Sequence, residues 1–198
     1  MEVLKVDDIV KKYKDVVAVD NLRFSLKKGE ILGFLGPNGA GKSSTMRMIM
    51  NITMPDKGKI DLFGEGFKDE FRDKIGYLPE ERGLYQNMKV LEHLIFLGQM
   101  KGMSNSEAKS SSLYWLEKVN MIDRKDSRVG ELSKGMAQKI QFIGTILHDP
   151  ELIIMDEPFS GLDPVNTKFL KDILIDMKNK DKAIILSTHL MENAEKLC

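Results

Sequence analysis

The sequence has a single cysteine, Cys198, and no long apolar run among its 198 residues. One cysteine excludes a disulfide framework within the chain, as expected of a protein in a reducing compartment. A membrane-spanning helix needs about 20 consecutive apolar residues, so we expect any membrane association to come through a partner. The first residues, Met1–Lys5, lead into an alternating strand pattern and show no signal peptide.

Neither sign of charge is in excess, because 30 Lys and Arg balance 30 Asp and Glu. Proteins whose main partner is a nucleic acid usually have a basic excess, so this balance argues against nucleic acid as a partner. The small basic cluster of Lys11, Lys12 and Lys14 is interpreted as a solvated strand end. With 42% apolar residues, the chain has the composition of one globular domain, with room for an inserted subdomain.

Strand and helix patterns alternate along the chain, which predicts an α/β fold with a mostly parallel, helix-covered sheet. The first two strands are expected to form an antiparallel β region, and Lys27–Glu30 is predicted to be a hairpin turn. The predicted strands cover residues 2–12, 19–27, 31–35, 59–63, 75–78, 152–155 and 183–186. The predicted helices cover residues 41–50, 90–100, 105–121, 133–148, 165–177 and 189 onward. We expect residues 1–82 and 151–198 to form one core, and about 83–150 to form a helical subdomain inserted in it.

The segment 36–43, Gly-Pro-Asn-Gly-Ala-Gly-Lys-Ser, follows an apolar strand and precedes a helix. In that context the motif predicts a phosphate-binding loop, because its glycines let successive N–H groups turn toward an anion at the helix N-terminus. Lys42 would bridge the outer phosphates of a nucleoside triphosphate, and Ser43 would give its hydroxyl oxygen to Mg²⁺. The predicted nucleotide contacts in this region are Gly36, Asn38, Gly39, Ala40, Gly41, Lys42, Ser43 and Ser44.

Two adjacent carboxylates, Asp156 and Glu157, follow the apolar strand predicted at residues 152–155. Ligand sites of α/β proteins lie at the carboxyl ends of their strands, so both side chains should face the phosphates. Asp156 is predicted to hold Mg²⁺. Glu157 is predicted to position the attacking water and to accept its proton.

A third motif, Leu-Ser-Lys-Gly-Met at 132–136, lies ahead of the carboxylate strand and begins a helix that Ser133 should cap. Together the three motifs resemble those of the ATP-binding subunit of an ABC transporter, over essentially the whole chain. The usual form of the third motif in that family is Leu-Ser-Gly-Gly-Gln, so Lys134 and Met136 depart from it. Ser133 and Gly135 are kept, and the resemblance implies that they bind the nucleotide held by a second copy.

Further positions match the family through their place in the order of motifs. The resemblance implies that Tyr13 stacks on adenine, that Asp163 lies in the loop after the carboxylates, and that His189 supports the catalytic water. Glu80 stands where the family usually has a glutamine. We expect Glu80 to keep a role as a Mg²⁺ ligand, while its charge changes the metal or pH dependence. The predicted catalytic group is Glu157, His189 and Lys42, and the predicted metal group is Ser43, Glu80 and Asp156.

The other two histidines have no expected nucleotide role. His93 lies within a predicted amphipathic helix, and His148 lies at the C-terminus of another. A positive charge on His148 would interact favourably with the dipole of that helix.

The resemblance implies an ATPase, with ATP and Mg²⁺ as cofactors, that energises transport through a separate transmembrane permease. The Glu-Glu-Arg sequence at 80–82 also resembles the exporter branch of the family, which hints at export. The implied partners are a second copy, joined head to tail by ATP, and the permease chain, with no nucleic acid. The implied location is cytoplasmic, peripheral on the inner face of the cell membrane. A soluble ABC ATPase in cofactor assembly or another non-transport role remains the alternative. Family members usually continue well beyond His189, so we expect the C-terminus to be truncated.

Overall fold

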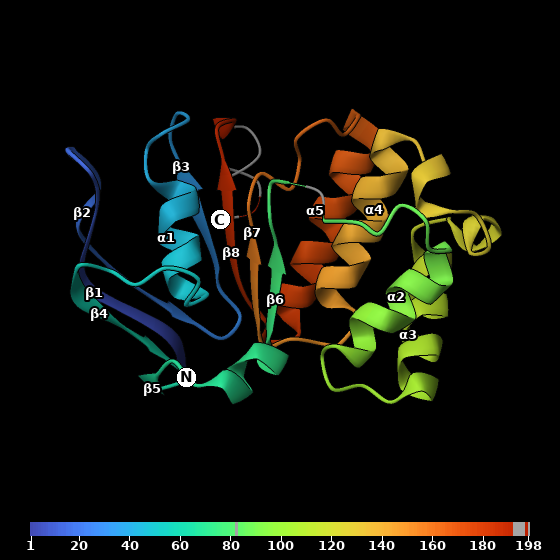
Figure 1. Cartoon of the computed structure of the whole chain (residues 1–198), viewed down its shortest axis with the longest axis horizontal. Helices are drawn as coiled ribbons and strands as arrows, with labels where there is room; N and C mark the ends of the chain where they lie inside the picture. The colour runs from blue at the N-terminus through green and yellow to red at the C-terminus, as the bar shows by residue number, and fades with distance from the viewer. Residues whose placement is uncertain (82, 192–196, 198) are drawn as a thin grey trace.

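The computed structural model describes residues 1–81, 83–191 and 197 of the chain. Two β-sheets lie beside one another, and a block of helices flanks the second sheet on the side away from the first (Figure 1). Within the described ranges, no helix is both long enough and apolar enough to cross a membrane. In this view the antiparallel sheet comes first, then the parallel sheet, then the block of helices.

The antiparallel sheet has the strand order β2-β1-β4-β5. Its strands are β1 at Glu2–Tyr13, β2 at Val16–Lys27, β4 at Lys57–Leu62 and β5 at Glu65–Gly66. One face of β1 is apolar, and its side chains are buried in a hydrophobic cluster with those of helix α1, Lys42–Ile49. The aromatic rings of Phe24 in β2 and Phe34 in the neighbouring sheet meet edge to face, with centroids 5.3 Å apart. This packing fixes the antiparallel sheet against the loop that precedes α1.

The parallel sheet has the order β3-β8-β7-β6. Its strands are β3 at Ile31–Leu35, β6 at Ile75–Leu78, β7 at Leu152–Met155 and β8 at Ala183–Thr188. Every residue of β7 and β8 is buried, because both faces of the sheet are covered. Leu152 and Ile154 pack in the cluster shared with α1, whereas Ile153 and Met155 pack on the opposite face. The parallel strands bring their carboxyl ends to one edge, where the candidate site lies.

Helices cover the outer face of the parallel sheet and extend beyond it. They are α2 at Val90–Gln99, α3 at Asn105–Lys118, α4 at Lys134–Ile146 and α5 at Pro164–Asn179, with short 3-10 turns at Asp69–Lys74, Ile122–Arg124 and Val129–Glu131. Helix α3 begins with a capping box, in which Ser104 and Glu107 cap each other reciprocally. Helix α4 contributes Phe142 to the cluster on the sheet and Ile143 to the cluster among the helices. It therefore joins the helical block to the sheet, while the boundaries of the two parts stay a prediction.

The hairpin predicted at Lys27–Glu30 is wrong. Strand β2 pairs with β1, and β3 pairs with β8, so this turn carries the chain from one sheet to the other. Since β3 contributes apolar side chains to both faces, it suits a parallel sheet that is covered on both sides better than a hairpin. The true hairpin is β1–β2, which turns at Lys14 with a positive φ of 54° and makes β2 begin at Val16. The helix predicted from residue 189 onward falls mostly outside the described residues.

The charge expected on His148 is also wrong. Burial, together with the positive charge of Lys101, lowers the pKa of His148 to about 4, so its ring is neutral at pH 7. Its Nε2 lies 3.3 Å from the carbonyl oxygen of Ile75. Loss of hydration at this position outweighs the attraction of a helix C-terminus for a cation.

Candidate functional site

The loop between β3 and α1 is pressed against β2 at one glycine. Gly41 has a φ of 84°, and a Cβ there would lie 2.1 Å from the carbonyl oxygen of Ala18. Only glycine fits, because both the backbone conformation and the space exclude a side chain. No side chain caps the N-terminus of α1, so the free N–H groups of its first turn are available to an anion.

A cavity of about 390 Å³ opens at this loop. It is lined by Ala18, Asn38, Gly39, Ala40, Gly41, Lys42, Ser43, Ser44, Glu80, Asp156 and Glu157. The structure thus brings together the predicted loop residues from Asn38 to Ser44 and all three predicted carboxylates, although they come from three distant parts of the sequence. Backbone N–H groups and one lysine face acidic side chains across the cavity, and this arrangement suits a phosphate group with a bridging cation.

The side chain of Lys42 lies between loop carbonyls and a carboxylate. Its Nζ donates to the carbonyl oxygens of Gly36, at 2.7 Å, and Pro37, at 3.1 Å. It also lies 3.9 Å from Glu157 Oε1, and the side chains of Lys42 and Glu157 are each only 9% exposed. The ammonium group is therefore held next to the loop by hydrogen bonds to neutral carbonyl oxygens, which a charged phosphate oxygen can replace.

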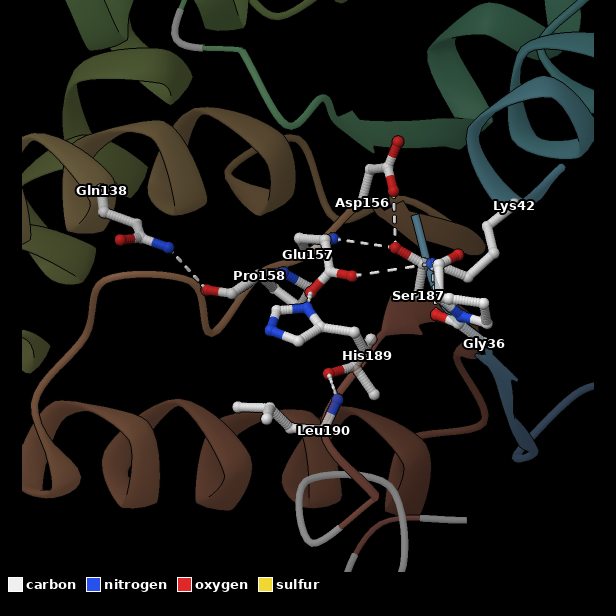
Figure 2. A network of polar contacts seen from close by, with 11 residues as sticks. Gly36, Lys42, Gln138, Asp156, Glu157, Pro158, Ser187, His189 and Leu190 are labelled. Carbon is white, nitrogen blue, oxygen red and sulfur yellow. Dashed lines mark hydrogen bonds and ion pairs between the residues drawn. The ribbon is translucent and has the colours of Figure 1, made fainter. Parts of the chain in front are cut away.

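Of the two carboxylate oxygens of Glu157, one makes a hydrogen-bond contact and the other has only the ion pair with Lys42. Its Oε2 lies 3.0 Å from His189 Nδ1 (Figure 2). Its Oε1 is buried and has no hydrogen-bond partner. The backbone at Glu157 has a positive φ of 49°, an uncommon conformation for a non-glycine residue. A partly buried carboxylate held by an imidazole, with an oxygen left over, can orient a water molecule and accept its proton.

Ser187, which the sequence reasoning missed, joins the two carboxylate residues. Its fully buried hydroxyl donates to Asp156 Oδ1 at 2.5 Å and accepts the backbone N–H of Glu157 at 2.9 Å (Figure 2). The signal that could have found it is a polar residue among the apolar residues of β8, directly before Thr188 and His189. Because β7 and β8 are neighbours in register, Ser187 lies opposite the peptide between Asp156 and Glu157.

The donor set fits Mg²⁺ when a phosphate is present. Ser43, Glu80 and Asp156 all line the cavity and offer the hard oxygen ligands that this ion prefers. Among the described residues, no group of three or more acidic, His or Cys side chains could hold a metal by itself. Mg²⁺ in nucleotide sites takes one or two carboxylates and completes its shell with phosphate and water, so the two observations agree.

A second cavity of about 170 Å³ adjoins the first and shares Glu80, Asp156 and Glu157 with it. Lys134, which departs from the family motif, lines this cavity, and its side chain lies over Gly161 in the loop after the carboxylates. A Cβ at Gly161 would lie 2.9 Å from Lys134 Cε.

Five predicted nucleotide contacts lie outside the larger cavity: Tyr13, Gly36, Ser133, Gly135 and Asp163. Ser133 caps α4 by accepting the N–H of Met136 at 3.3 Å, and Gly135 beside it has open space around its Cα. Asp163 caps α5 in the same way, and the N–H of Asn166 that it accepts lowers the pKa of its carboxyl. Tyr13 is 43% exposed at the end of β1, with Lys11 Nζ 5.6 Å from its ring centre. Ser133 and Gly135, at the start of α4, thus line neither of the two polar cavities.

Comparison with known proteins gives consistent matches along the chain. The ABC transporter domain family matches residues 19–160. An uncharacterized ABC transporter ATP-binding protein of Bacillus subtilis (strain 168) is 47% identical over 195 residues, which cover 98% of this chain and 65% of that protein. The Nod factor export ATP-binding protein I of Rhizobium sp. (strain N33) is 40% identical over 193 residues, covering 96% of this chain and 64% of its own. A solved structure of an ATP binding subunit of an ABC transporter superposes with a TM-score of 0.90 at 33% identity, covering 99% of this chain and 83% of that one. The chain thus spans about two thirds of the length of these two relatives.

Proposed function

Because the chain belongs to the ABC transporter family, we propose that it binds ATP with Mg²⁺ and hydrolyses it to energise export through a separate membrane permease. The observation that carries the proposal is the cavity in which the phosphate loop meets Glu80, Asp156 and Glu157. The proposed direction of transport, export, rests on the relative named for Nod factor export. Since the chain spans only part of its relatives, the proposal concerns the whole protein to which this chain belongs.

Binding begins at the loop. The N–H groups of the segment 38–44 hold the phosphates of ATP, and Lys42 exchanges the carbonyl oxygens of Gly36 and Pro37 for phosphate oxygens. Ser43 and Asp156 hold Mg²⁺, with Glu80 as a third oxygen donor. When bound, the ion neutralises charge that develops on the transferred phosphoryl group.

Glu157 acts as the general base. Its Oε1, which makes no hydrogen bond, accepts a proton from water, while His189 holds Oε2 and fixes the direction of the carboxylate. Ser187 holds the Glu157 peptide in its left-handed conformation through the backbone N–H. Lys42, close to the base and to the phosphates, stabilises the negative charge of the transition state.

A second copy of the chain completes the site. Ser133 and Gly135 lie at the open N-terminus of α4, outside the cavity of their own chain. A helix N-terminus carries a partial positive charge and attracts phosphate. We place this end against the nucleotide of the second copy, head to tail, so that ATP closes the dimer and loss of phosphate opens it.

We place the permease contact at a cavity of about 320 Å³ between the end of α1, strand β6 and the helical block. Its lining is mostly apolar and includes Tyr77, Leu97 and the exposed Met100, and it reaches Pro79 beside Glu80. A permease segment bound here would touch residues of both parts and the Glu80 loop. The protein would then lie on the cytoplasmic face of the cell membrane, bound through its partner.

The test is made on the full-length protein. Phosphate release should require Mg²⁺ and ATP, and a chain with several membrane spans should co-purify from detergent-solubilised membranes. Hydrolysis with only soluble companions, and with the protein absent from the membrane fraction, would favour the alternative of a soluble ATPase in cofactor assembly. Absence of any nucleotide binding would overturn both.

A further inference from the structure

The side-chain amide of Gln141 holds the loop of Glu80 from both sides. Its Nε2 lies 3.1 Å from the carbonyl oxygen of Pro79 and 3.3 Å from that of Glu81, and donates to both. These are the carbonyl groups that flank Glu80 in the chain. Both hydrogens of one NH₂ group are thus used on one loop, which fixes the path of the backbone at Glu80.

Glu80 depends on this contact for its position. Its residue is exposed, and among the described residues its carboxylate makes no hydrogen bond or ion pair. Nevertheless it lines both polar cavities, together with Asp156 and Glu157. A side chain without partners is aimed by its backbone, so the residue that holds the backbone also directs the carboxylate.

The chemistry of position 141 is specific. An amide offers two donors to the two carbonyl oxygens, whereas a glutamate of the same shape would offer two acceptors and be repelled by them. Gln141 lies on α4 between the small polar cavity and the apolar cavity assigned to the permease, and Gln141 and Pro79 line both. One turn earlier on the helix, Gln138 Nε2 donates to the carbonyl oxygen of Pro158 at 2.7 Å. Helix α4 is therefore tied to the loops of both Glu80 and Glu157.

We propose that Gln141 is a positioning residue, which holds Glu80 in place toward Mg²⁺ and couples it to movement of α4. The proposal rests on the proposed function, in which Glu80 is an oxygen donor to that ion. Gln141 does not line the larger cavity, so we expect its effect on Mg²⁺ to pass through Glu80.

The experiment compares Gln141→Met in the full-length protein with Gln141→Met in a Glu80→Ala background. Met has a similar length and no donors, and Gln141→Glu is the second variant, with reversed polarity. Gln86→Met is the matched control, because Gln86 also donates its amide to a loop carbonyl, that of Leu84, at 3.3 Å, but lies outside both polar cavities. Two quantities are measured: the Mg²⁺ concentration that half-saturates ATP binding, and amide hydrogen exchange of the segment 78–81 without nucleotide.

In the protein that keeps Glu80, Gln141→Met should raise the half-saturating Mg²⁺ concentration about tenfold and lower kcat about tenfold, as expected for a misplaced ligand. Exchange of the segment 78–81 should become faster, Gln141→Glu should have the larger effect, and the control should match the wild type. In the Glu80→Ala background, the same substitution should change the Mg²⁺ response by less than about twofold.

Two results would overturn the proposal: an unchanged Mg²⁺ response in Gln141→Met and Gln141→Glu, or the same fold-change with and without Glu80. The second result would mean a general structural effect. If the wild type binds MgATP but releases no phosphate, the proposed function fails, while the Mg²⁺ titration still decides the role of Gln141.

Discussion

The hydroxyl of Ser187 donates to Asp156 Oδ1 at 2.5 Å, although the two residues lie 31 positions apart in the chain. The same oxygen accepts the N–H of Glu157 at 2.9 Å. One buried hydroxyl thus orients the metal carboxylate and holds the backbone of the general base. Among the described residues this hydroxyl makes no other hydrogen bond, so substituting Ser187 tests these two contacts directly.

Replacing Ser187 by Ala should lower kcat for ATP hydrolysis by about 10- to 100-fold, because misplacement of catalytic groups is costly. ATP affinity should change less than about threefold, since the loop makes most phosphate contacts. Ser112→Ala is the control: Ser112 is also fully buried and donates at 2.6 Å, but to Ala108 within α3. An equal loss of activity in both variants would show that a buried hydroxyl matters only for stability.

Replacing Glu157 by Gln should reduce phosphate release by about 10²- to 10⁴-fold, the usual contribution of a general base. ATP binding should remain, because the amide keeps the size of the side chain and removes a negative charge near the phosphates. Equilibrium binding of ATP and steady-state release of phosphate are measured on the same sample. Undiminished release would mean that another group takes the proton.

Gly41→Ala and Gly39→Ala form a matched pair, since both glycines have a φ of 84°. Gly39→Ala should cost about 1 kcal/mol of stability, from backbone strain alone. Gly41→Ala should cost about 3 kcal/mol or more, because its Cβ would also meet the carbonyl oxygen of Ala18. Urea denaturation of both variants measures the difference, and similar midpoints would show that β2 does not press on the loop.

Acid should destabilise the protein through His148. Its folded pKa of about 4 lies below the unfolded value of about 6.5, so the unfolded chain binds more protons between these values. Its contribution to stability is thus complete above about pH 6.5 and falls as the pH approaches 4. In His148→Gln this part of the pH dependence should be absent. Unfolding free energies of the two proteins from pH 7.5 to 4.5 give the comparison, and parallel curves would contradict the assignment.

The local parts of the site could be predicted from the sequence. The loop at 36–43 and the pair Asp156–Glu157 are contiguous motifs, and their chemistry depends on neighbours in the chain. Capping of α4 by Ser133 was equally local, and the structure confirms it. Whether these residues bind and hydrolyse ATP stays a prediction for the experiments above.

The contacts of Ser187 and Gln141 could not be predicted, because each depends on the register of elements far apart in the sequence. Ser187 reaches Asp156 only because β8 lies beside β7, and Gln141 reaches the Glu80 loop only because α4 crosses the end of β6. The hairpin prediction at Lys27–Glu30 failed for the same reason, since the sequence of a turn does not determine which strands the two flanking strands pair with.

The close approach of Gly41 to Ala18 restricts the choice of amino acid at position 41 but not at position 18. What Gly41 meets at position 18 is a main-chain oxygen, which every amino acid possesses. The side chain at 18 is therefore free to vary as far as this contact is concerned, while position 41 has no freedom at all. The backbone of β2 thus limits where the phosphate-binding loop can lie. A shift in the path of β2 would change the affinity for phosphate even if every residue of the loop stayed the same.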